Sequence, residues 1–337
     1  MLSIILAPFS WLYGAITCLR NFLYDVGLKK SYSFDQAVIA VGNLNVGGTG
    51  KTPMIEYLVR LLSGQYSVAI LSRGYGRRTK GFRLADGSDD ASTIGDEPFQ
   101  FYEKFKGKVE VVVCENRVDG INQLIALKKS IQVILLDDAF QHRRVKPLHS
   151  ILLTDFSKPF FNDFILPKGR LRESRNGSSR ADVVVVTKCK PMTVEMESGY
   201  KKEIQTYAGH KSIFFAAIGY NKPVSLADTS LGKDLVLVTG LANSNPLVEH
   251  VSEKINLCFH FQFDDHHEYT LKEVEDIQQK ASAMNASILT TEKDFVKLAK
   301  RVDKKLWFYL PIETQFLNNG SEFDKLVIEK IKSHLRN

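Results

Sequence analysis

The sequence has few cysteines, and none of them stands in a metal-binding or redox motif. The 337 residues include four, Cys18, Cys114, Cys189 and Cys258, with no CxxC pair and no His/Cys ligand spacing. Structural zinc sites and disulfide frameworks both require clustered cysteines. The pattern therefore suits a reducing compartment and gives no sign of a zinc site.

Internal repeats and low-complexity tracts are also absent from the sequence. Apolar residues make up 44% and charged residues 25%, an ordinary globular composition that argues against long disorder. The chain is long for one domain and comfortable for two. Its net charge of +7 favours an anionic partner, which composition alone leaves open between phospholipid, phosphorylated substrate and nucleic acid.

The first 19 residues contain no charge, and Arg20, Lys29 and Lys30 follow. A secretory signal is excluded by the missing basic n-region and by the ATP-binding motif that comes next. Three interpretations stay open: an interfacial amphipathic helix, a single-span anchor, or a helix docked on the protein's own core. We favour membrane contact, because this apolar block precedes the first predicted strand.

Short β-branched runs alternate with helical stretches, a pattern typical of a parallel sheet flanked by helices. The pattern predicts an α/β protein with a mainly parallel sheet, a smaller α/β domain and an N-terminal hydrophobic helix; the glycine loop described next makes the fold P-loop NTPase-like. The predicted domains are a membrane-associating helix (1–30), a first α/β domain (31–190), a connection (191–211) and a smaller C-terminal α/β domain (212–337). The motifs below identify the first of these α/β domains as a P-loop kinase domain. Predicted strands are Ala37–Val41, Ser67–Leu71, Val109–Val113, Val133–Leu136, Ser150–Leu153, Asp182–Thr187, Ile213–Ile218, Leu235–Thr239, Leu257–Phe261, Ser287–Leu289 and Leu306–Tyr309.

The segment AVIAVGNLNVGGTGKTPMIEYLVRLL has the layout strand, glycine loop, helix. Gly47, Gly48 and Gly50 let the backbone turn its N–H groups inward around a phosphate. Lys51 then reaches the β/γ-phosphates, and the Thr52 hydroxyl is available to Mg²⁺. A glycine-rich turn that binds nothing is the alternative, and the flanking strand and helix argue against it.

The loop departs from the GxxxxGK[ST] pattern at its first glycine, where this chain has Asn45. Asparagine tolerates left-handed backbone better than most residues, so the motif is weakened without being lost. The predicted ATP-binding residues are Asn45, Val46, Gly47, Gly48, Thr49, Gly50, Lys51 and Thr52.

A second acidic motif, IQVILLDDAFQH, ends a buried strand at Asp137 and Asp138. Two acids at a strand end are often a turn or a helix cap. Beside a P-loop, Asp137 fits the role of the Mg²⁺-anchoring acid, together with Thr52. The segment beginning at Thr187 has a lysine, Lys190, where a guanine-binding motif has its aspartate, which favours ATP over GTP.

Polar clusters follow consecutive strands: SRGYGRR with Arg73 and Tyr75, GDEP with Asp96, and CENRVDG with Arg117. Such strand ends share one edge of a sheet, where open α/β folds bind ligands. Each cluster alone is more often a solvated loop than a site. Together they predict a surface for a phosphate acceptor.

Eight motifs taken together carry a family resemblance, namely GNLNVGGTGKTP, SRGYGRR, GDEP, ENR, LLDDAFQH, LPKGRLRE, FDDHHEY and TTEKD. In this order and spacing, over residues 38–298, the chain resembles the tetraacyldisaccharide 4′-kinases of lipid A biosynthesis. The family often has DDGLQH where this chain has DDAFQH, which retains both acids, Gln141 and His142.

The resemblance implies transfer of the ATP γ-phosphate to the 4′-hydroxyl of a tetraacyl glucosamine disaccharide 1-phosphate. It also implies Mg²⁺ as cofactor and the cytoplasmic face of the bacterial inner membrane as location. By motif match Asp96 is the base, His266 pairs with it in preference to His267, Asp138 orients metal or nucleophile, and Lys51 contacts the phosphates. The pairing requires both domains to face one cleft. The part played by Thr291, Glu292, Lys293 and Asp294 stays open between base contact, hinge and helix cap.

The segment 155–180 mixes phenylalanines with lysines and arginines, and Arg170–Arg180 is its most loop-like part. Such a surface suits nucleic acid or acyl chains beside anionic headgroups. No RNA-binding motif appears, so we expect a lipid acceptor and a membrane surface, with no nucleic acid and no obligate protein partner. The residues expected to hold the sugar and its phosphate are Arg73, Tyr75, Arg117, Gln141 and Asn162.

Two other functions remain in competition. A switch ATPase or metallochaperone-type NTPase would use the same loop without a sugar acceptor, and a kinase of a soluble acceptor would have no use for the apolar N-terminus. Acyl-chain preference and oligomeric state are not encoded in any motif.

Overall fold

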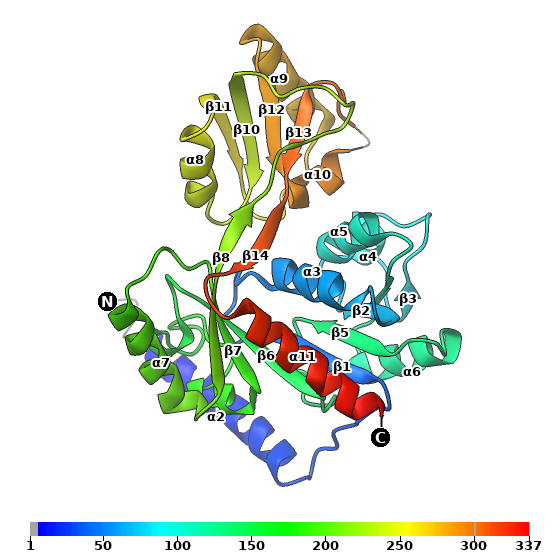
Figure 1. Ribbon diagram of the computed structural model, residues 1–337, viewed down its shortest axis with the longest axis vertical. Coiled ribbons are helices and arrows are strands. Elements are labelled where there is room, and N and C mark those ends of the chain that lie inside the picture. The colour runs from blue at the N-terminus through cyan, green and yellow to red at the C-terminus, as the bar shows by residue number, and fades with distance from the viewer. Residues whose placement is uncertain (1–5, 300, 337) are drawn as a thin grey trace.

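The computed structural model of the chain describes residues 6–299 and 301–336, which form two lobes, each built on one β-sheet (Figure 1). The large-lobe strands are β1 (Ala37–Asn43), β2 (Val68–Ser72), β3 (Arg83–Leu84), β4 (Glu110–Val113), β5 (Val133–Asp137), β6 (His149–Asp155), β7 (Val183–Thr187), β8 (Ser212–Tyr220) and β14 (Ile312–Phe316). The small-lobe strands are β9 (Val224–Ser225), β10 (Asp234–Gly240), β11 (Asn256–Phe263), β12 (Ser287–Thr291) and β13 (Trp307–Leu310).

The strand order is β14-β8-β7-β6-β1-β5-β2-β4-β3 in the large sheet and β11-β10-β12-β13-β9 in the small one. Pairing is parallel through the centre of both sheets and antiparallel at the edges formed by β14, β3 and β9. The predicted α/β class with mainly parallel sheets is confirmed, and each predicted strand is present. The short edge strands β3, β9 and β14 were not predicted.

Helices cover the sheets on both faces. They are α2 (Ala7–Asp25), α3 (Lys51–Leu62), α4 (Ala91–Ile94), α5 (Asp96–Phe105), α6 (Arg117–Leu127), α7 (Val194–Ala208), α8 (Asn245–Ser252), α9 (Leu271–Ala283), α10 (Glu292–Leu298) and α11 (Gly320–Leu335), with 3-10 turns η1 (Phe160–Asn162) and η2 (Arg175–Arg180).

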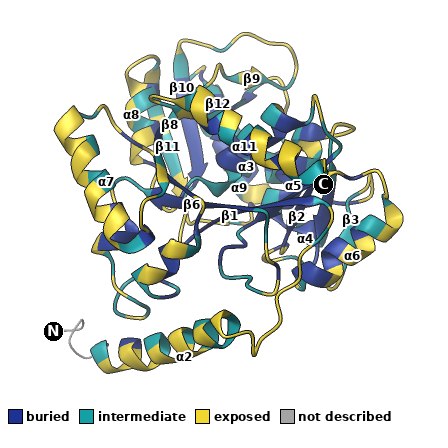
Figure 2. Ribbon diagram, turned by 60° about the horizontal axis from the view of Figure 1, so that its bottom comes forward, coloured by how far each residue is buried: buried dark blue, intermediate teal, exposed yellow. Residues whose placement is uncertain are grey.

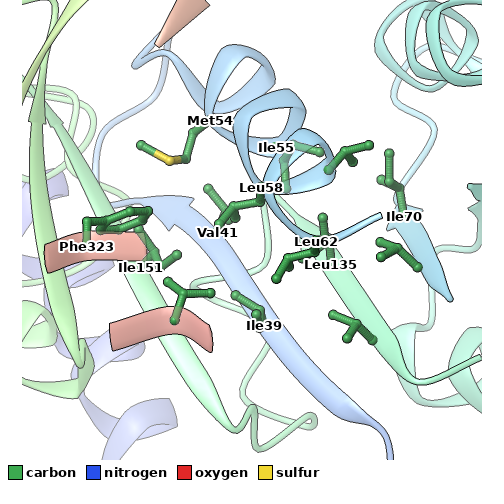
Figure 3. Packing of buried hydrophobic residues seen from close by; sticks show 14 of the residues in the cluster. Ile39, Val41, Met54, Ile55, Leu58, Leu62, Ile70, Leu135, Ile151 and Phe323 are labelled. Atoms are coloured by element: carbon green, nitrogen blue, oxygen red, sulfur yellow. The ribbon is translucent and has the colours of Figure 1, made fainter. Parts of the chain in front are cut away.

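The alternation of side chains along β1 divides the large lobe into two cores. Ile39 and Val41 point towards α3 and α11, where they pack with Leu58 and Phe323 (Figure 3). Val38 and Ala40 point to the opposite face and pack towards α6. Because both faces of β1 are covered, the whole strand is buried and carries no polar side chain before its last residue, Asn43, which lies beside the glycine loop.

The division between the lobes differs from the predicted boundary at residue 212. β8 pairs in parallel with β7 and so extends the large sheet, and β14 returns from the small lobe to pair with β8. The C-terminal helix α11 buries Phe323, Val327 and Ile331 in the large-lobe core. The predicted connection 191–211 contains α7, whose Ile204 packs on the same lobe. An alternating apolar pattern identifies a strand but not the sheet that it joins.

The N-terminal helix α2 lies along the outside of the large lobe and is mostly exposed (Figure 2). Its outer face is apolar, with Trp11 74% and Leu12 63% exposed. Its inner face is attached to the lobe by Arg20, which donates to the Gln141 carbonyl at 2.8 Å. No helix within residues 6–299 and 301–336 has the length and apolar character to cross a bilayer. The single-span interpretation therefore lacks support; residues 1–5 of the predicted segment lie outside the described residues.

Candidate active site

The glycine loop connects β1 to the first turn of α3, as predicted. Gly47 and Gly50 have φ of 104° and 78°, a left-handed backbone that glycine adopts at no steric cost. The neighbouring strand β7 supports the loop, because Thr187 Oγ1 donates to the Thr49 carbonyl at 2.9 Å and Lys188 Nζ donates to the Gly48 carbonyl at 2.5 Å. The loop therefore precedes a helix N-terminus, the standard arrangement for binding phosphate.

Asn45 does not take the left-handed backbone that we expected at the missing glycine. It forms an isolated antiparallel bridge with Leu171, and its Nδ2 donates to Asp163 at 2.8 Å. The next residue, Val46, donates from its backbone N–H to the Arg170 carbonyl at 2.8 Å. The first part of Arg170–Arg180, expected to be a flexible loop, is thus paired with the glycine loop and forms its wall.

The two acids of the DD motif have different environments. Asp137 is buried and accepts a hydrogen bond from Ser72 Oγ at 3.1 Å. Asp138 accepts from both terminal nitrogens of Arg172, at 2.9 and 3.1 Å, and its carboxylate lies 3.8 Å from Lys51 Nζ. Arg172 also donates to Asn43 Oδ1 at 2.6 Å. The lysine of the glycine loop and the end of the acidic strand are therefore adjacent.

These environments shift the two pKa values in opposite directions. Burial, with the nearby charges of Glu97 and Asp138, raises the pKa of Asp137. Burial alone would also raise the pKa of Asp138, but Lys51 and Arg172 bring it below its usual value. Glu97 follows Asp96 in the GDEP segment, so this segment lies near the same edge of the sheet. A bound divalent cation would favour the ionised form of Asp137.

Asp96 begins α5 and contacts the small lobe. Its Oδ2 lies 3.1 Å from His266 Nδ1 and 2.6 Å from Lys297 Nζ of α10. Burial would raise the pKa of Asp96, but the hydrogen bonds from His266 and Lys297 outweigh it and keep that pKa below the usual value. The carboxylate is therefore ionised at neutral pH, with a histidine from the other lobe against it.

His266, rather than its neighbour, makes this contact. His267 Nε2 lies 3.2 Å from Glu273, and its ring stacks on Phe263. His266 has φ of 63° and Asp138 has φ of 46°. Left-handed backbone is uncommon for residues other than glycine, and such strain concentrates at functional sites.

The predicted acceptor-binding residues fall into two groups. Arg73, Tyr75 and Asn162 are exposed, and the Tyr75 ring centroid lies 6.2 Å from that of His266. Arg117 is only 2% exposed, and its Nη1 donates to the Cys114 carbonyl at 2.8 Å. Gln141 donates to the Asn43 carbonyl at 2.8 Å.

The direct substrate contact expected of Arg117 is therefore at odds with its position, because its guanidinium faces the protein interior beneath the strand ends. The amide nitrogen of Gln141 likewise donates its hydrogen bond to the backbone at the end of β1 instead of pointing to a substrate. A sequence motif identifies a residue near a site but does not say whether its side chain points into or away from it.

Three residues of the site were not predicted as such: Asn43, Arg172 and Lys297. Asn43 interrupts an apolar strand directly before the loop, and Arg172 lies in the LPKGRLRE motif, so both had a signal in the sequence. Lys297 lies one helical turn beyond TTEKD, and nothing local distinguishes it from a surface lysine.

A family model described as tetraacyldisaccharide-1-P 4′-kinase matches residues 2–332 of this chain. The chain belongs to this family. The tetraacyldisaccharide 4′-kinase of Flavobacterium psychrophilum is 45% identical, over 98% of this chain and 98% of the relative. The protein of the same name from Cytophaga hutchinsonii is 41% identical, over 99% and 97% of the two chains.

A solved structure is similar over the same extent. The "apo" form of LpxK from Aquifex aeolicus, in complex with ATP, matches with a TM-score of 0.77 and 28% identity, covering 98% of this chain and 100% of that one. The family resemblance predicted from the motifs is confirmed. The switch-ATPase alternative loses its support, since the matched relatives are named as kinases.

Proposed function

We propose that this chain transfers the γ-phosphate of ATP to the 4′-hydroxyl of a tetraacyl glucosamine disaccharide 1-phosphate, forming the 1,4′-bisphosphate (lipid IVA) of lipid A biosynthesis. The observation that carries the proposal is the contact between Asp96 and His266 across the two lobes. A sugar hydroxyl is a weak nucleophile at neutral pH, so its attack benefits from a carboxylate base poised by a neighbour.

The geometry assigns the two Asp96 oxygens to different tasks. His266 and Lys297 both contact Oδ2, and within the described residues Oδ1 makes no hydrogen bond. In the proposed step Oδ1 takes the proton of the 4′-hydroxyl as the sugar oxygen forms a bond to the γ-phosphorus. The bond from that phosphorus to the β–γ bridging oxygen breaks, and ADP leaves.

The glycine loop and the acids would hold the nucleotide. Backbone N–H groups of residues 47–52 would face the phosphates, and Lys51 would move from its contacts with Asn43 and Asp138 to the β/γ-phosphates. Asp138 and its partner Arg172 flank the same space.

Mg²⁺ would be held by Asp137 and Thr52, where it neutralises charge on the phosphates. The buried Asp137 carboxylate, with Asp138 next to it, fits this ion. No cluster of three or more His, Cys, Asp or Glu side chains that could hold a metal occurs in residues 6–299 and 301–336. Phosphate oxygens and water would complete the coordination, as is usual for Mg²⁺.

The acceptor would lie against the exposed residues Arg73, Tyr75 and Asn162, of which Tyr75 lies beside His266. We also propose that α2 binds the cytoplasmic face of the inner membrane with its apolar outer face, lying in the interface rather than spanning it. The lipid acceptor and the enzyme would then both be located at the membrane surface.

The test is an ATP-dependent phosphorylation assay with the acylated disaccharide 1-phosphate, run on the wild type, Lys51→Ala and Asp96→Ala. We expect near-complete loss of activity in both variants, with ATP binding retained only by Asp96→Ala. Full activity of Asp96→Ala would contradict the proposed base.

The membrane proposal has its own test in vesicle sedimentation. Replacing Trp11 and Leu12 by serine should weaken binding to vesicles that contain anionic lipid. The matched control is Leu127→Ser, an equally exposed leucine on α6 (62%). Equal binding by all three proteins would exclude α2 as the attachment site.

A further inference from the structure

The TTEKD motif forms the start of α10, a helix that the small lobe holds rigidly. Thr291 caps the helix by accepting from the Asp294 N–H at 3.0 Å. Asp294 is buried and accepts from the Gly240 N–H at 2.8 Å, which fixes the helix to the end of β10. Of the three possibilities left open for this motif, helix capping accounts for Thr291 but not for Glu292 or Lys293.

α10 lies beside α5 of the large lobe (Figure 1), and ion pairs join both ends of the two helices. Asp96, the first residue of α5, lies 2.6 Å from Lys297 in the second turn of α10. Lys104, near the end of α5, lies 2.6 Å from Glu292, the first residue of α10. The helices therefore run antiparallel, and the second ion pair is about 12 Å along α5 from the first.

The ammonium of Lys104 also contacts the helix that follows the glycine loop. Its Nζ lies 2.6 Å from Glu56 of α3, whose side chain is 1% exposed. Gln100 Nε2 and Arg60 Nη2 donate to the same carboxylate, at 2.9 and 3.1 Å. One partly buried cation thus joins the phosphate-binding helix, the helix that begins with the base, and the lobe that supplies the histidine.

Ion pairs of this kind contribute little net stability, because desolvating the charges offsets their attraction, yet breaking one leaves an uncompensated charge. Their directional hydrogen bonds do fix the relative placement of the helices that carry them. The charges of Lys104 and Arg60 balance those of Glu56 and Glu292, so the cluster is neutral as a unit.

We propose that Lys104 is a positioning residue, whose bridge between Glu56 and Glu292 holds α10 against α5 and α3 so that His266 and Lys297 meet Asp96. Substitution of Lys104 should then weaken the contacts of His266 and Lys297 with Asp96, although Lys104 itself contacts none of these three residues. This inference rests on the proposed roles of Asp96 and His266 in phosphate transfer.

The bridge makes a distinctive kinetic prediction. The groups that face Asp96 from neighbouring elements are Lys297 on α10 and His266, and Lys293 and Asp265 lie behind the histidine. If these groups withdraw, the carboxylate becomes easier to protonate. The acidic limb of the pH profile of kcat/KM should then move to higher pH, which a purely structural role of Lys104 would not cause.

The experiment compares full-length Lys104→Met, Lys104→Arg and Lys106→Met, the last being an exposed lysine at the end of the same helix. For Lys104→Met we expect kcat to fall at least ~10-fold, with KM for ATP within ~2-fold and the acidic limb displaced upward. Lys104→Arg should recover most of kcat, and Lys106→Met should match the wild type.

A double variant, Lys104→Met with Glu292→Gln, controls for misfolding. Glu56 keeps Arg60 as its partner, and the second substitution removes the charge of Glu292 that the loss of Lys104 would leave unpaired. It should regain thermal stability relative to Lys104→Met while keeping the loss of kcat. A folded double variant with wild-type kcat and pH profile would overturn the inference. Asp96→Ala in the same assay separates the two claims. If Asp96→Ala is active, the proposed base is wrong. If Asp96→Ala is inactive while the Lys104 variants behave as the wild type, only the role of Lys104 is wrong.

Discussion

The large lobe supplies the phosphate-binding loop as one continuous segment, whereas the small lobe supplies the partners of Asp96 from two separate segments. The glycine loop, Lys51 and Thr52 follow each other along the chain, and their geometry is set locally by a strand, two left-handed glycines and a helix start. His266 and Lys297 are 31 residues apart; His266 follows β11 and Lys297 lies on α10, so only the fold of the small lobe brings both to Asp96.

This difference separates binding from catalysis. We expect the large lobe to bind a nucleotide alone, since the whole glycine loop lies within it. The base, Asp96, acquires His266 and Lys297 as partners only when the small lobe packs against α5. Changes in the glycine loop and the residues that support it should therefore affect both nucleotide affinity and turnover, and changes in the small lobe should affect turnover alone.

Among residues that support Lys51 and the proposed base, the largest effect is expected from Arg172→Met in the large lobe. The substitution removes the bidentate partner of Asp138 and the hydrogen bond to Asn43, so kcat/KM should fall by about 10²-fold, at roughly 1.4 kcal/mol per tenfold. The control is Arg170→Met, whose partly exposed side chain pairs with Asp163. Steady-state assays at varied ATP concentration measure kcat/KM for both variants. A similar fall of kcat/KM in Arg172→Met and Arg170→Met would count against a specific role for Arg172.

The next effect is expected from His266→Ala in the small lobe. Loss of the group that poises Asp96 should lower kcat by ~10–100-fold and leave KM for ATP within ~2-fold. His267→Ala, which removes a contact with Glu273 instead, should lower kcat by less than ~3-fold. Equal effects of the two substitutions would remove the distinction between the histidines.

A smaller effect concerns pH. The His266 and Lys297 hydrogen bonds hold the pKa of Asp96 below its usual value, so removing His266 lets that pKa rise. Because the base is active when ionised, the acidic limb of kcat/KM should move to higher pH in His266→Ala and stay unchanged in His267→Ala. The profile of each variant between pH 4 and pH 8 tests this sign.

The smallest effect on activity is expected from Arg117→Met. The guanidinium is buried and donates to backbone carbonyls, so the change should lower the free energy of unfolding by about 2–3 kcal/mol. KM values for ATP and acceptor should stay within ~2-fold. Urea unfolding and steady-state kinetics of the variant check this. If Arg117→Met unfolds at the same urea concentration as the wild type but has a higher KM for the acceptor alone, Arg117 contacts the acceptor directly, as the sequence suggested.

Sequence patterns predicted the strands, the loop and the acids because each depends on neighbours along the chain. The membership of β8 and α11 in the large lobe depends on long-range pairing, which no local pattern contains. Arg117 lies near the strand ends that carry the proposed site, but the direction of its side chain depends on packing that no local motif contains. Lys104 and Lys297 look like surface lysines in sequence, and only the docking of α10 on α5 gives them partners.

The central claim is that Asp96 acts on the acceptor while the glycine loop holds ATP. Single-turnover phosphate transfer by Asp96→Asn, with ATP affinity measured in parallel, tests it most directly. We predict a chemical step slowed by ~10²–10⁴-fold with Kd for ATP within ~3-fold. An unchanged chemical step, or a loss of ATP affinity as large as the loss of rate, would contradict the account.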